Sequence, residues 1–289
     1  KIYGKNLKPI NYIVPIPSAQ VKSGLILAAL NTAGSSTIIE KNTTRDHTEI
    51  MLESFGANIK INNQNNVKQI TIKGKQELRS KNIHVPSDLS SSAFFIVAAL
   101  ISSNSNLFIE NININPTRDG ILTALEKMGA NIKVMNKRLI NNEVVANLEV
   151  KSSKLKGCCL DAEMSELMID EYPILSIAAS FADSPSVFKG LKELRVKESN
   201  RLELIRLNLE RCGVDCAVKK DDLYINPSRK YVVKDNRIIT SYDHRIAMAF
   251  SVMGGMLNQD LNILESKCIN TSFPNFIKIF NKIGGNLIE

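Results

Sequence analysis

The 289-residue sequence contains no tryptophan, three histidines and only 6% aromatic residues. Proteins that bind single-stranded nucleic acids stack bases on aromatic side chains, and this composition gives no sign of such a surface. Five cysteines occur without a Cys-x-x-Cys pair, and the histidines are scattered, so the spacing of a zinc site is missing. We therefore expect no bound metal and no disulfide framework.

Long apolar runs are also missing, since no stretch of about 18 apolar residues occurs. The first 30 residues lack the pattern of a secretory signal, and the sequence predicts a cytoplasmic protein. The net charge of +8 admits nucleic acid, an anionic membrane surface or small anionic substrates as partners. Because lysine is dispersed among asparagine and isoleucine, most of this charge is expected to be solvated surface.

Four segments share one pattern, the end of an amphipathic helix followed by a glycine and a short strand. They are "MLESFGANIKI" (51–61), "ALEKMGANIKV" (124–134), "NLERCGVDCAV" (208–218) and "IFNKIGGNLIE" (279–289). The shared glycines are Gly56, Gly129, Gly213 and Gly284. Glycine is preferred where a helix ends in a left-handed conformation, so each is predicted to end its helix.

A second kind of helix, rich in alanine and apolar on most faces, alternates with these segments. Its copies are "SAQVKSGLILAAL" (18–30), "SDLSSSAFFIVAAL" (87–100), "IDEYPILSIAASFA" (169–182) and "YDHRIAMAFSVMGG" (242–255). Helices of this kind are typical of buried positions. The order predicts a unit of β, buried helix, β, amphipathic helix, β, β, repeated four times in an α/β core. A domain boundary is predicted near 82–88, where Pro86 interrupts the pattern.

Polar clusters stand at the starts of the apolar helices, and helix starts favour anions. Serine and aspartate also cap helices, and for the run Asp88 to Ser92 capping is the preferred interpretation. Asp46 with Glu49 resembles a capping box, and Thr117 is a candidate N-cap. Arginines near the starts of the amphipathic helices lack such a local reason and suit carboxylate or phosphate, although an exposed arginine without a role is equally common. These arginines are Arg45, Arg118 and Arg201.

The stretch "ELRVKESNRLELIRLNLERCG" (193–213) gathers Lys197, Glu198 and Arg201 around the start of an amphipathic helix. Their i, i+3 and i, i+4 spacing puts the charges on neighbouring faces of one turn. From the spacing alone, a solvated ion pair on the surface is the preferred interpretation, and a binding site is the alternative.

Longer motifs identify the chain as a member of a known family by resemblance. They are "PSAQVKSGLILAAL", "TRDHTEIML", "NPTRDGIL", "IDEYPILSIAA", "ELRVKESNRL", "DHRIAMAF" and "TSFP". In this order they resemble 5-enolpyruvylshikimate-3-phosphate synthase, and "SAQVKS" and "TSFP" resemble its glyphosate-tolerant branch. The resemblance implies an α/β fold of two lobes, each an inside-out barrel of three βαβαββ units. On this basis 1–86 is the last unit of a partial N-terminal lobe, and 87–289 is a three-unit C-terminal lobe.

The family joins shikimate-3-phosphate to phosphoenolpyruvate and releases phosphate without a metal or an organic cofactor. By resemblance, Asp170 deprotonates the attacking hydroxyl, Lys197 contacts that hydroxyl or the nearby phosphate, and Glu198 protonates phosphoenolpyruvate. Arg201 and Arg245 hold the carboxylate and phosphate of phosphoenolpyruvate. The implied contacts of shikimate-3-phosphate are Ser18, Ala19 (through its backbone), Gln20 and Arg45. Thr271 stands before "SFP" where some members carry a lysine, so that contact is not carried over.

An early Lys-Ser…Arg motif and an "R-P-M"-like motif that the family uses for phosphoenolpyruvate are not found in the sequence. The sequence also begins with Lys1, and the resemblance covers four units of six. We therefore expect that the chain corresponds to the C-terminal two-thirds of the enzyme and requires the N-terminal segment for full activity. We also expect it to be a monomer.

Three alternatives remain open at the level of sequence. The first is the sister activity, UDP-N-acetylglucosamine enolpyruvyl transferase, whose reactive-cysteine loop has no match in this chain. The second is an anion- or nucleic-acid-binding module, which predicts binding that weakens steeply with salt. The third is a non-catalytic remnant.

Overall fold

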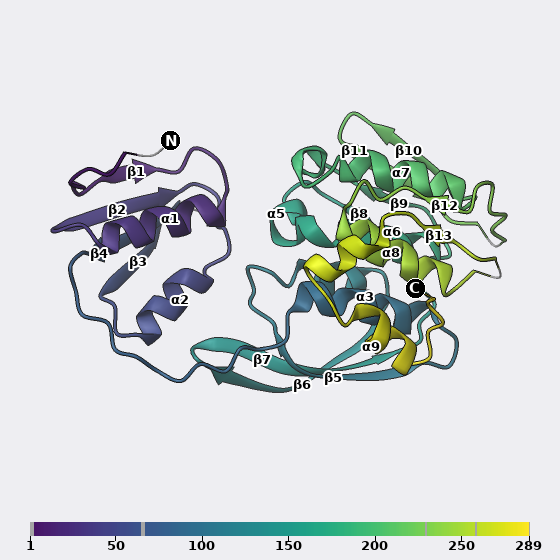
Figure 1. The fold of residues 1–289 in the computed structure, drawn as a ribbon, viewed down its shortest axis with the longest axis horizontal. Coiled ribbons are helices and arrows are strands. Elements are labelled where there is room, and N and C mark those ends of the chain that lie inside the picture. The colour runs from purple at the N-terminus through teal and green to yellow at the C-terminus, as the bar shows by residue number, and fades with distance from the viewer. Residues whose placement is uncertain (1–2, 65–66, 229, 258, 289) are drawn as a thin grey trace. The chain divides into compact units, whose positions relative to one another are not determined.

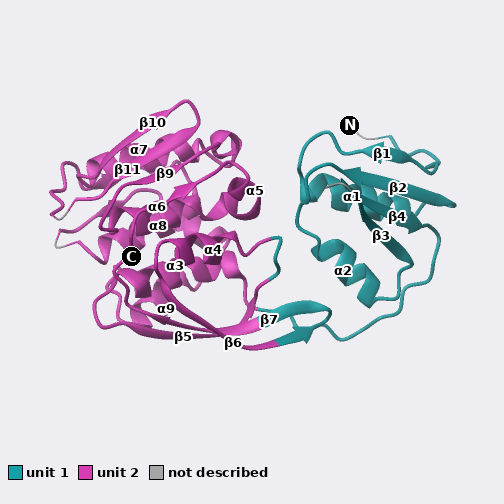
Figure 2. Cartoon of the chain, turned by 180° about the vertical axis from the view of Figure 1, so that it is seen from behind, with its two compact units in different colours: residues 1–86, 115–117, 138–145 teal, residues 87–114, 118–137, 146–289 magenta. Residues whose placement is uncertain are grey.

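The computed structural model describes residues 3–64, 67–228, 230–257 and 259–288 (Figure 1). The chain divides into two compact units, which Figure 2 colours separately. Unit 1 comprises residues 1–86, 115–117 and 138–145, and unit 2 comprises 87–114, 118–137 and 146–289. The chain therefore leaves unit 1 after Pro86 and returns to it twice. The assignment of these units to the lobes of a larger enzyme stays a prediction.

The described residues of unit 1 form one four-stranded sheet and two helices. Its elements are β1 (Asn11–Ile13), α1 (Ala19–Leu30), β2 (Ser35–Glu40), α2 (His47–Ser54), β3 (Ile59–Gln64) and β4 (Val67–Lys73). The strand order is β1-β2-β4-β3. Strand β1 runs parallel to β2, and the other two pairings are antiparallel. This is the β, helix, β, helix, β, β order that the repeats predict.

Helix α1 is apolar on most faces, but it is buried mainly on one of them. The face that packs on β2 and β4 buries Ile26 and Ala29 against Ile38, Ile70 and Ile72. On the rest of the helix, the side chains of Val21 and Leu27 are 40% and 50% exposed. The predicted full burial of this helix is therefore wrong within unit 1, because the face with Val21 and Leu27 is left exposed.

Unit 2 contains the remaining elements. They are α3 (Leu89–Ile101), β5 (Asn106–Asn113), α4 (Gly120–Lys127), β6 (Asn131–Ile140), β7 (Glu143–Lys151), β8 (Cys159–Leu160), α5 (Met164–Met168), the 3₁₀ turn η1 (Ile169–Glu171), α6 (Tyr172–Ser180), β9 (Ser186–Phe188), the 3₁₀ turn η2 (Lys192–Val196), α7 (Arg201–Arg211), β10 (Asp215–Lys219), β11 (Asp222–Asn226), β12 (Arg237–Ile238), α8 (His244–Gly254), β13 (Asn262–Ile263), the 3₁₀ turn η3 (Ser266–Thr271) and α9 (Phe276–Lys282). The β6–β7 hairpin is shared, since its residues 138–145 cluster with unit 1.

Sheet topology confirms the repeat. The order β8-β9-β11-β10 reproduces the order β1-β2-β4-β3, with the first pair again parallel. The sheet β5-β7-β6 gains a fourth position where Ser87 bridges Ile112 in parallel, and β12 pairs with β13 in parallel. The strand predicted after Gly284 is not formed by residues 285–288, because the Asn281 side chain bonds the backbone of Leu287 (2.8 and 2.7 Å); Glu289 lies outside the described residues.

Three apolar helices, α3, α6 and α8, form the core of unit 2 and contact one another (Figure 1). All residues of α6 are buried, as are most residues of α3 and α8. The serines in these helices do not leave unsatisfied hydroxyls. Ser176, Ser180 and Ser251 each donate to the carbonyl four residues earlier, at 2.7, 2.8 and 2.8 Å.

Glycine ends the amphipathic helices as predicted. Gly129 and Gly213 follow α4 and α7 with φ angles of +81° and +82°, a region that residues with a Cβ avoid. Gly56 and Gly284 follow α2 and α9 with positive φ as well.

Among the described residues, no helix combines the length and the apolar character that crossing a membrane requires.

Candidate active site

Arg201 is the centre of a buried ionic cluster in unit 2. It is the first residue of α7, and its side chain is 1% exposed. The guanidinium donates through Nε to Asp243 Oδ2 (2.8 Å) and through Nη1 to Asp170 Oδ1 (3.1 Å). Its Nη2 donates to Glu198. A buried guanidinium needs such partners because desolvation of an unpaired charge costs several kcal/mol, by order of magnitude.

The prediction of a solvated ion pair, which the spacing favours, is therefore wrong, because Arg201 is buried. Helix α7 starts only at Arg201, because Asn200 caps it by accepting from the Glu203 N–H (3.3 Å). Lys197 follows η2 in an extended conformation, so Lys197 and Glu198 precede the helix and do not lie on its first turn. The three residues do lie together: Glu198 pairs with Arg201 directly, and Lys197 and Arg201 both lie beside Asp170.

Lys197 and Glu198 are the accessible members of the cluster. Lys197 Nζ lies 3.7 Å from Asp170 Oδ1 and also pairs with Glu193. The Glu198 side chain is 56% exposed, whereas Asp170 is 16% exposed. Among the carboxylates on Arg201, Glu198 is thus the one that a ligand in solution reaches most directly.

Arg245 connects the starts of three core helices. It is the second residue of α8, and its Nη1 donates to Ser90 Oγ of α3 (2.8 Å) and to the Asp170 carbonyl (3.2 Å). The same atom lies 3.8 Å from Glu171 Oε1, and Ser90 also donates to this carboxylate. Burial raises the pKa of Glu171, although Arg245 and Ser90 oppose that effect.

Asp243 organises the cluster from the N-cap of α8. Its carboxylate accepts from the Arg245 and Ile246 N–H groups (2.9 and 3.4 Å), from Ser199 Oγ (2.8 Å) and from Arg201. Burial alone would raise the pKa of Asp243, but Arg201 and these hydrogen bonds outweigh it and hold the pKa below its usual range.

His244, next to Asp243, has its pKa lowered by burial and by the Arg245 charge. The ring is therefore neutral near pH 7, since even the ordinary pKa of histidine is about 6.5. It adds no positive charge to the start of α8.

The sequence suggested capping for Ser90, within the run Asp88 to Ser92, and assigned no individual role to Glu171, Ser199 or Asp243. The structure places all four residues in this cluster. The available signal was the polar start of each apolar helix. The sequence does not show which residue each of them contacts, because contacting residues such as Arg201 and Asp243 are 42 residues apart in the chain.

The other predicted site residues belong to unit 1. Ser18 caps α1, since its Oγ accepts from the Val21 N–H (3.3 Å), and Ala19 and Gln20 follow in the first turn. Arg45 lies between β2 and α2, is partly buried, and follows Thr44, which is contacted by Lys22 of α1. Unit 1 thus holds its four predicted residues on two segments that share a contact.

Two predicted helix caps are not formed. Asp46 makes no side-chain cap to α2 and accepts instead from Asn115 Nδ2 (2.8 Å), while Glu49 is buried against lysines. Thr117 donates to Asn115 Oδ1 (2.7 Å), and α4 begins later, at Gly120. The Asp46 cap fails because a tertiary partner competes for its side chain, and Thr117 instead bonds a side chain two residues before it.

Arg118 and Asp88 form a pair in unit 2. Arg118 Nη2 lies 3.2 Å from Asp88 Oδ1. Asp88 also caps α3 by accepting from the Ser91 N–H (2.9 Å), so capping is confirmed for Asp88. Arg118 is therefore bound by a carboxylate of its own unit.

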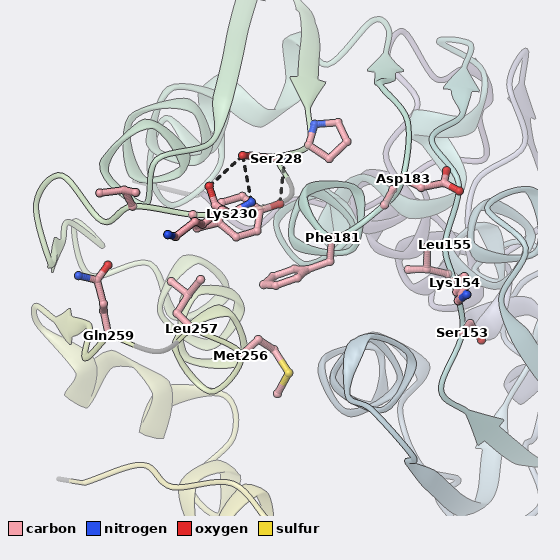
Figure 3. A pocket seen from close by; sticks show the side chains of 14 residues that line it. Ser153, Lys154, Leu155, Phe181, Asp183, Ser228, Lys230, Met256, Leu257 and Gln259 are labelled. Carbon is pink, nitrogen blue, oxygen red and sulfur yellow. Dashed lines mark hydrogen bonds between the residues drawn. The ribbon is translucent and has the colours of Figure 1, made fainter.

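A pocket among the described residues lies at the other ends of two core helices, α6 and α8 (Figure 3). It has a volume of about 910 Å³ and is lined by Phe181, which follows α6, and Met256, which follows α8. Asp170 and Arg245 stand at the starts of these helices, about 13 Å away for the nine residues of α6. Helix C-termini carry partial negative charge and do not favour anions. The pocket is therefore separate from the ionic cluster.

No group of His, Cys, Asp and Glu side chains in the described ranges has the arrangement of a metal site. The chemistry that the cluster offers is that of carboxylates, a lysine and arginines: proton transfer and the binding of anions.

Comparison with solved structures defines the class of protein. The chain superposes on the enolpyruvyl transferase NikO from Streptomyces tendae with a TM-score of 0.73 at 17% identity, covering 98% of this chain and 65% of that one. This likeness shows the fold, an α/β fold of enolpyruvyl transferases. A structure of EPSP synthase from Acinetobacter baumannii matches with a TM-score of 0.88 and 39% identity, covering 98% of this chain and 64% of that one.

Sequence comparison gives the particular family. The family model for EPSP synthase (3-phosphoshikimate 1-carboxyvinyltransferase) matches residues 1–280, and the chain belongs to this family. The 3-phosphoshikimate 1-carboxyvinyltransferase of Chelativorans sp. (strain BNC1) is 45% identical over 285 residues, and that of Pseudomonas sp. (strain PG2982) is 46% identical over 286. Each alignment covers 98% of this chain and 64% of the relative, so the chain spans about two-thirds of the length of these relatives.

Proposed function

We propose that this chain acts in the transfer of the enolpyruvyl group of phosphoenolpyruvate to the 5-hydroxyl of shikimate-3-phosphate, with release of phosphate. Membership of the EPSP synthase family supports this reaction. The observation that carries the proposal for the site is the buried Arg201, which gathers Asp170, Glu198 and Asp243 around one guanidinium. The site combines an accessible acid, Glu198, with two arginines at the starts of α7 and α8.

The roles follow from the chemistry of the two substrates. Phosphoenolpyruvate is a poor electrophile until its methylene carbon is protonated, and the exposed Glu198 is the proposed donor of that proton. Asp170 takes the proton of the attacking hydroxyl, whose oxygen bonds to the carbon that carries the phosphate group. Phosphate then leaves, and the methylene is restored by loss of a proton.

Arginine and lysine supply the contacts to the anionic groups. Arg201 and Arg245 are assigned to phosphoenolpyruvate, because guanidinium groups bind carboxylate and phosphate in a planar, bidentate manner. Lys197 is assigned to the reacting hydroxyl or the phosphate beside it. In unit 1, shikimate-3-phosphate is assigned to four residues: Ser18, Ala19, Gln20 and Arg45.

Binding is the primary test, since the chain spans 64% of the length of its relatives. Calorimetry with the 289-residue chain is expected to detect shikimate-3-phosphate but not UDP-N-acetylglucosamine, the acceptor of the sister activity. A matched pair of variants, Arg45→Ala and Arg79→Ala, separates the predicted contact from a general loss of charge. Only Arg45→Ala should weaken binding, by about tenfold or more, as expected for a charge-assisted contact.

Phosphate release provides the second test. In a complete enzyme that includes the N-terminal segment, release is expected to require both substrates and to fall by at least about a hundredfold in Asp170→Asn, the size typical of a general base. Binding of UDP-N-acetylglucosamine in place of shikimate-3-phosphate would overturn the proposal. So would salt-sensitive binding of nucleic acid with no binding of either acceptor.

A further inference from the structure

A cluster of four charged side chains is buried in unit 1. Lys22 of α1, Glu40 at the end of β2, Glu49 of α2 and Lys68 of β4 are each at most 5% exposed. Lys22 Nζ lies 3.0 Å from Glu40 Oε2 and 2.9 Å from Glu49 Oε1. Lys68 Nζ lies 3.1 Å from the same Glu49 oxygen. Two lysines and two glutamates balance in charge and connect four elements.

A gain in stability is not the expected role of this cluster. Unit 1 has a small apolar core built around Ile26, Ile38, Ile70 and Ile72, and the cluster adds ion pairs to it rather than apolar contacts. Buried ion pairs are often no more stable than apolar residues of similar volume, because desolvation offsets their attraction. The alternative role is to hold the neighbouring chain segments in one conformation.

The contacts converge on Thr44. Lys22 Nζ donates to the Thr44 carbonyl (3.3 Å), and the Thr44 hydroxyl donates to Glu40 Oε1 (2.5 Å). The residue before Arg45 is thus held at both its backbone and its side chain. Lys22 itself lies one turn after Ser18, whose carbonyl accepts from the Lys22 N–H (3.0 Å).

A second contact joins the same two segments. Ser23 Oγ of α1 and Thr48 Oγ1 of α2 are 2.7 Å apart. The start of α1, with Ser18 and Gln20, is therefore tied to the segment on both sides of Arg45.

We propose that Lys22 and Glu40 are positioning residues that fix Arg45 relative to the start of α1, so that both present one anion-binding surface. The inference rests on the proposed function, in which these segments bind shikimate-3-phosphate. Neither Lys22 nor Glu40 touches the substrate in this scheme. Their effect passes through Thr44, while Glu49 and Lys68 complete the charge balance.

Two double variants of the 289-residue chain separate these roles. Lys22→Met/Glu40→Leu removes one opposite-charge pair together with both contacts to Thr44, and leaves the Glu49–Lys68 pair. The matched control, Glu49→Leu/Lys68→Met, also removes one opposite-charge pair but leaves Lys22, Glu40 and Thr44 in contact. Thr44→Val, which removes only the hydroxyl, provides a third variant that disturbs the core least.

The readouts are calorimetric binding of shikimate-3-phosphate and hydrogen exchange of residues 44–52 in the free chain. Lys22→Met/Glu40→Leu is expected to weaken binding by about tenfold to a hundredfold, the size of a misplaced contact, and to speed exchange at the start of α2. The control should change the affinity and the exchange rate by less than about twofold. The effects of Thr44→Val should lie between those of the two double variants.

A double-mutant cycle with Arg45→Ala excludes a merely structural effect. If Lys22 and Glu40 act through Arg45, Arg45→Ala should cost no further affinity in the Lys22→Met/Glu40→Leu chain. Wild-type affinity of that double variant, or a full additional loss from Arg45→Ala, would overturn the inference. If the unaltered chain binds no shikimate-3-phosphate, the proposed function is wrong, and unchanged exchange at 44–52 would then reject the positioning role as well.

Discussion

Arg201 Nε donates a 2.8 Å hydrogen bond to Asp243 Oδ2 and so joins the start of α7 to the start of α8. Both side chains are buried, at 1% and 0% exposure. The same carboxylate caps α8 through the Arg245 N–H, so one aspartate fixes the position of both arginines. The geometry of the candidate active site therefore depends on a residue that the proposed reaction does not use directly.

Asp243→Ala is expected to destabilise unit 2 by about 3 kcal/mol, because it leaves the buried Arg201 with fewer partners. The measurement is the urea midpoint followed by circular dichroism. Glu198→Gln is the control, since it alters an exposed partner of the same arginine and should cost less than about 1 kcal/mol. Equal losses in the two variants would contradict the buried character of the Arg201–Asp243 pair.

Glu198→Gln is expected to separate catalysis from binding. In a complete enzyme that includes the N-terminal segment, loss of the proposed proton donor should lower phosphate release by at least about a hundredfold. Affinity for shikimate-3-phosphate should change by less than about twofold, because the assigned contacts of that substrate do not include Glu198. Phosphate release and calorimetry on the same preparation provide the comparison, and a variant of unaltered turnover would remove Glu198 from the mechanism.

Glu171→Gln is expected to change how stability depends on pH. Because burial raises the pKa of Glu171, the folded state binds this proton more tightly than the unfolded chain, whose glutamate pKa is about 4.3. The resulting stabilisation is complete below about pH 4.3 and is lost as the pH rises through the raised pKa.

Glutamine keeps a neutral side chain at this position, so the free energy of unfolding of Glu171→Gln should fall less steeply as the pH increases above about 4.3. Urea midpoints at a series of pH values, compared with those of the unaltered chain and of Glu198→Gln, measure the difference. Parallel profiles for all three chains would show that Glu171 does not titrate in this way.

Gly213→Ala and Gly129→Ala should differ although both glycines follow a helix at nearly the same positive φ. A Cβ at residue 129 meets nothing within 4 Å, and its cost should be the conformational one alone, about 1 kcal/mol. A Cβ at residue 213 would lie 2.3 Å from the Val232 carbonyl oxygen, so about 2 kcal/mol or more should be added. Urea denaturation of the two variants tests this order, which the reverse ranking would refute.

Local patterns were sufficient to predict the repeated unit. The four helix-ending glycines and the apolar helices follow from residues within one turn of each other, and the elements of unit 1 have the predicted order along the chain. Local rules failed where a distant residue competes for the same side chain. Asp46 resembles a helix cap, but Asn115 occupies its carboxylate from 69 residues away.

The same dependence on distant residues explains why the candidate site was predicted only in part. The spacing of Lys197, Glu198 and Arg201 gave the clustering but suggested a solvated pair, because nothing near them in the sequence shows that Arg201 is buried. Asp243 and Asp170 decide that, and they lie 42 and 31 residues away. Lys22 is a similar case, since a lysine in an apolar helix shows its role only once Glu40 and Thr44 are placed beside it.

Because the chain returns to unit 1 twice, the gene cannot be divided into two contiguous coding sequences that each encode one complete unit. A coding sequence that stops at residue 86 would omit Asn115 and Glu143, which hold Asp46 (2.8 Å) and His47 (2.5 Å) at the beginning of α2. The helix that follows Arg45 would then begin without its neighbours, and the isolated polypeptide would lack part of its own fold. The smallest autonomous version of unit 1 is therefore discontinuous in sequence, and it would have to carry the hairpin tip of residues 138–145 with it.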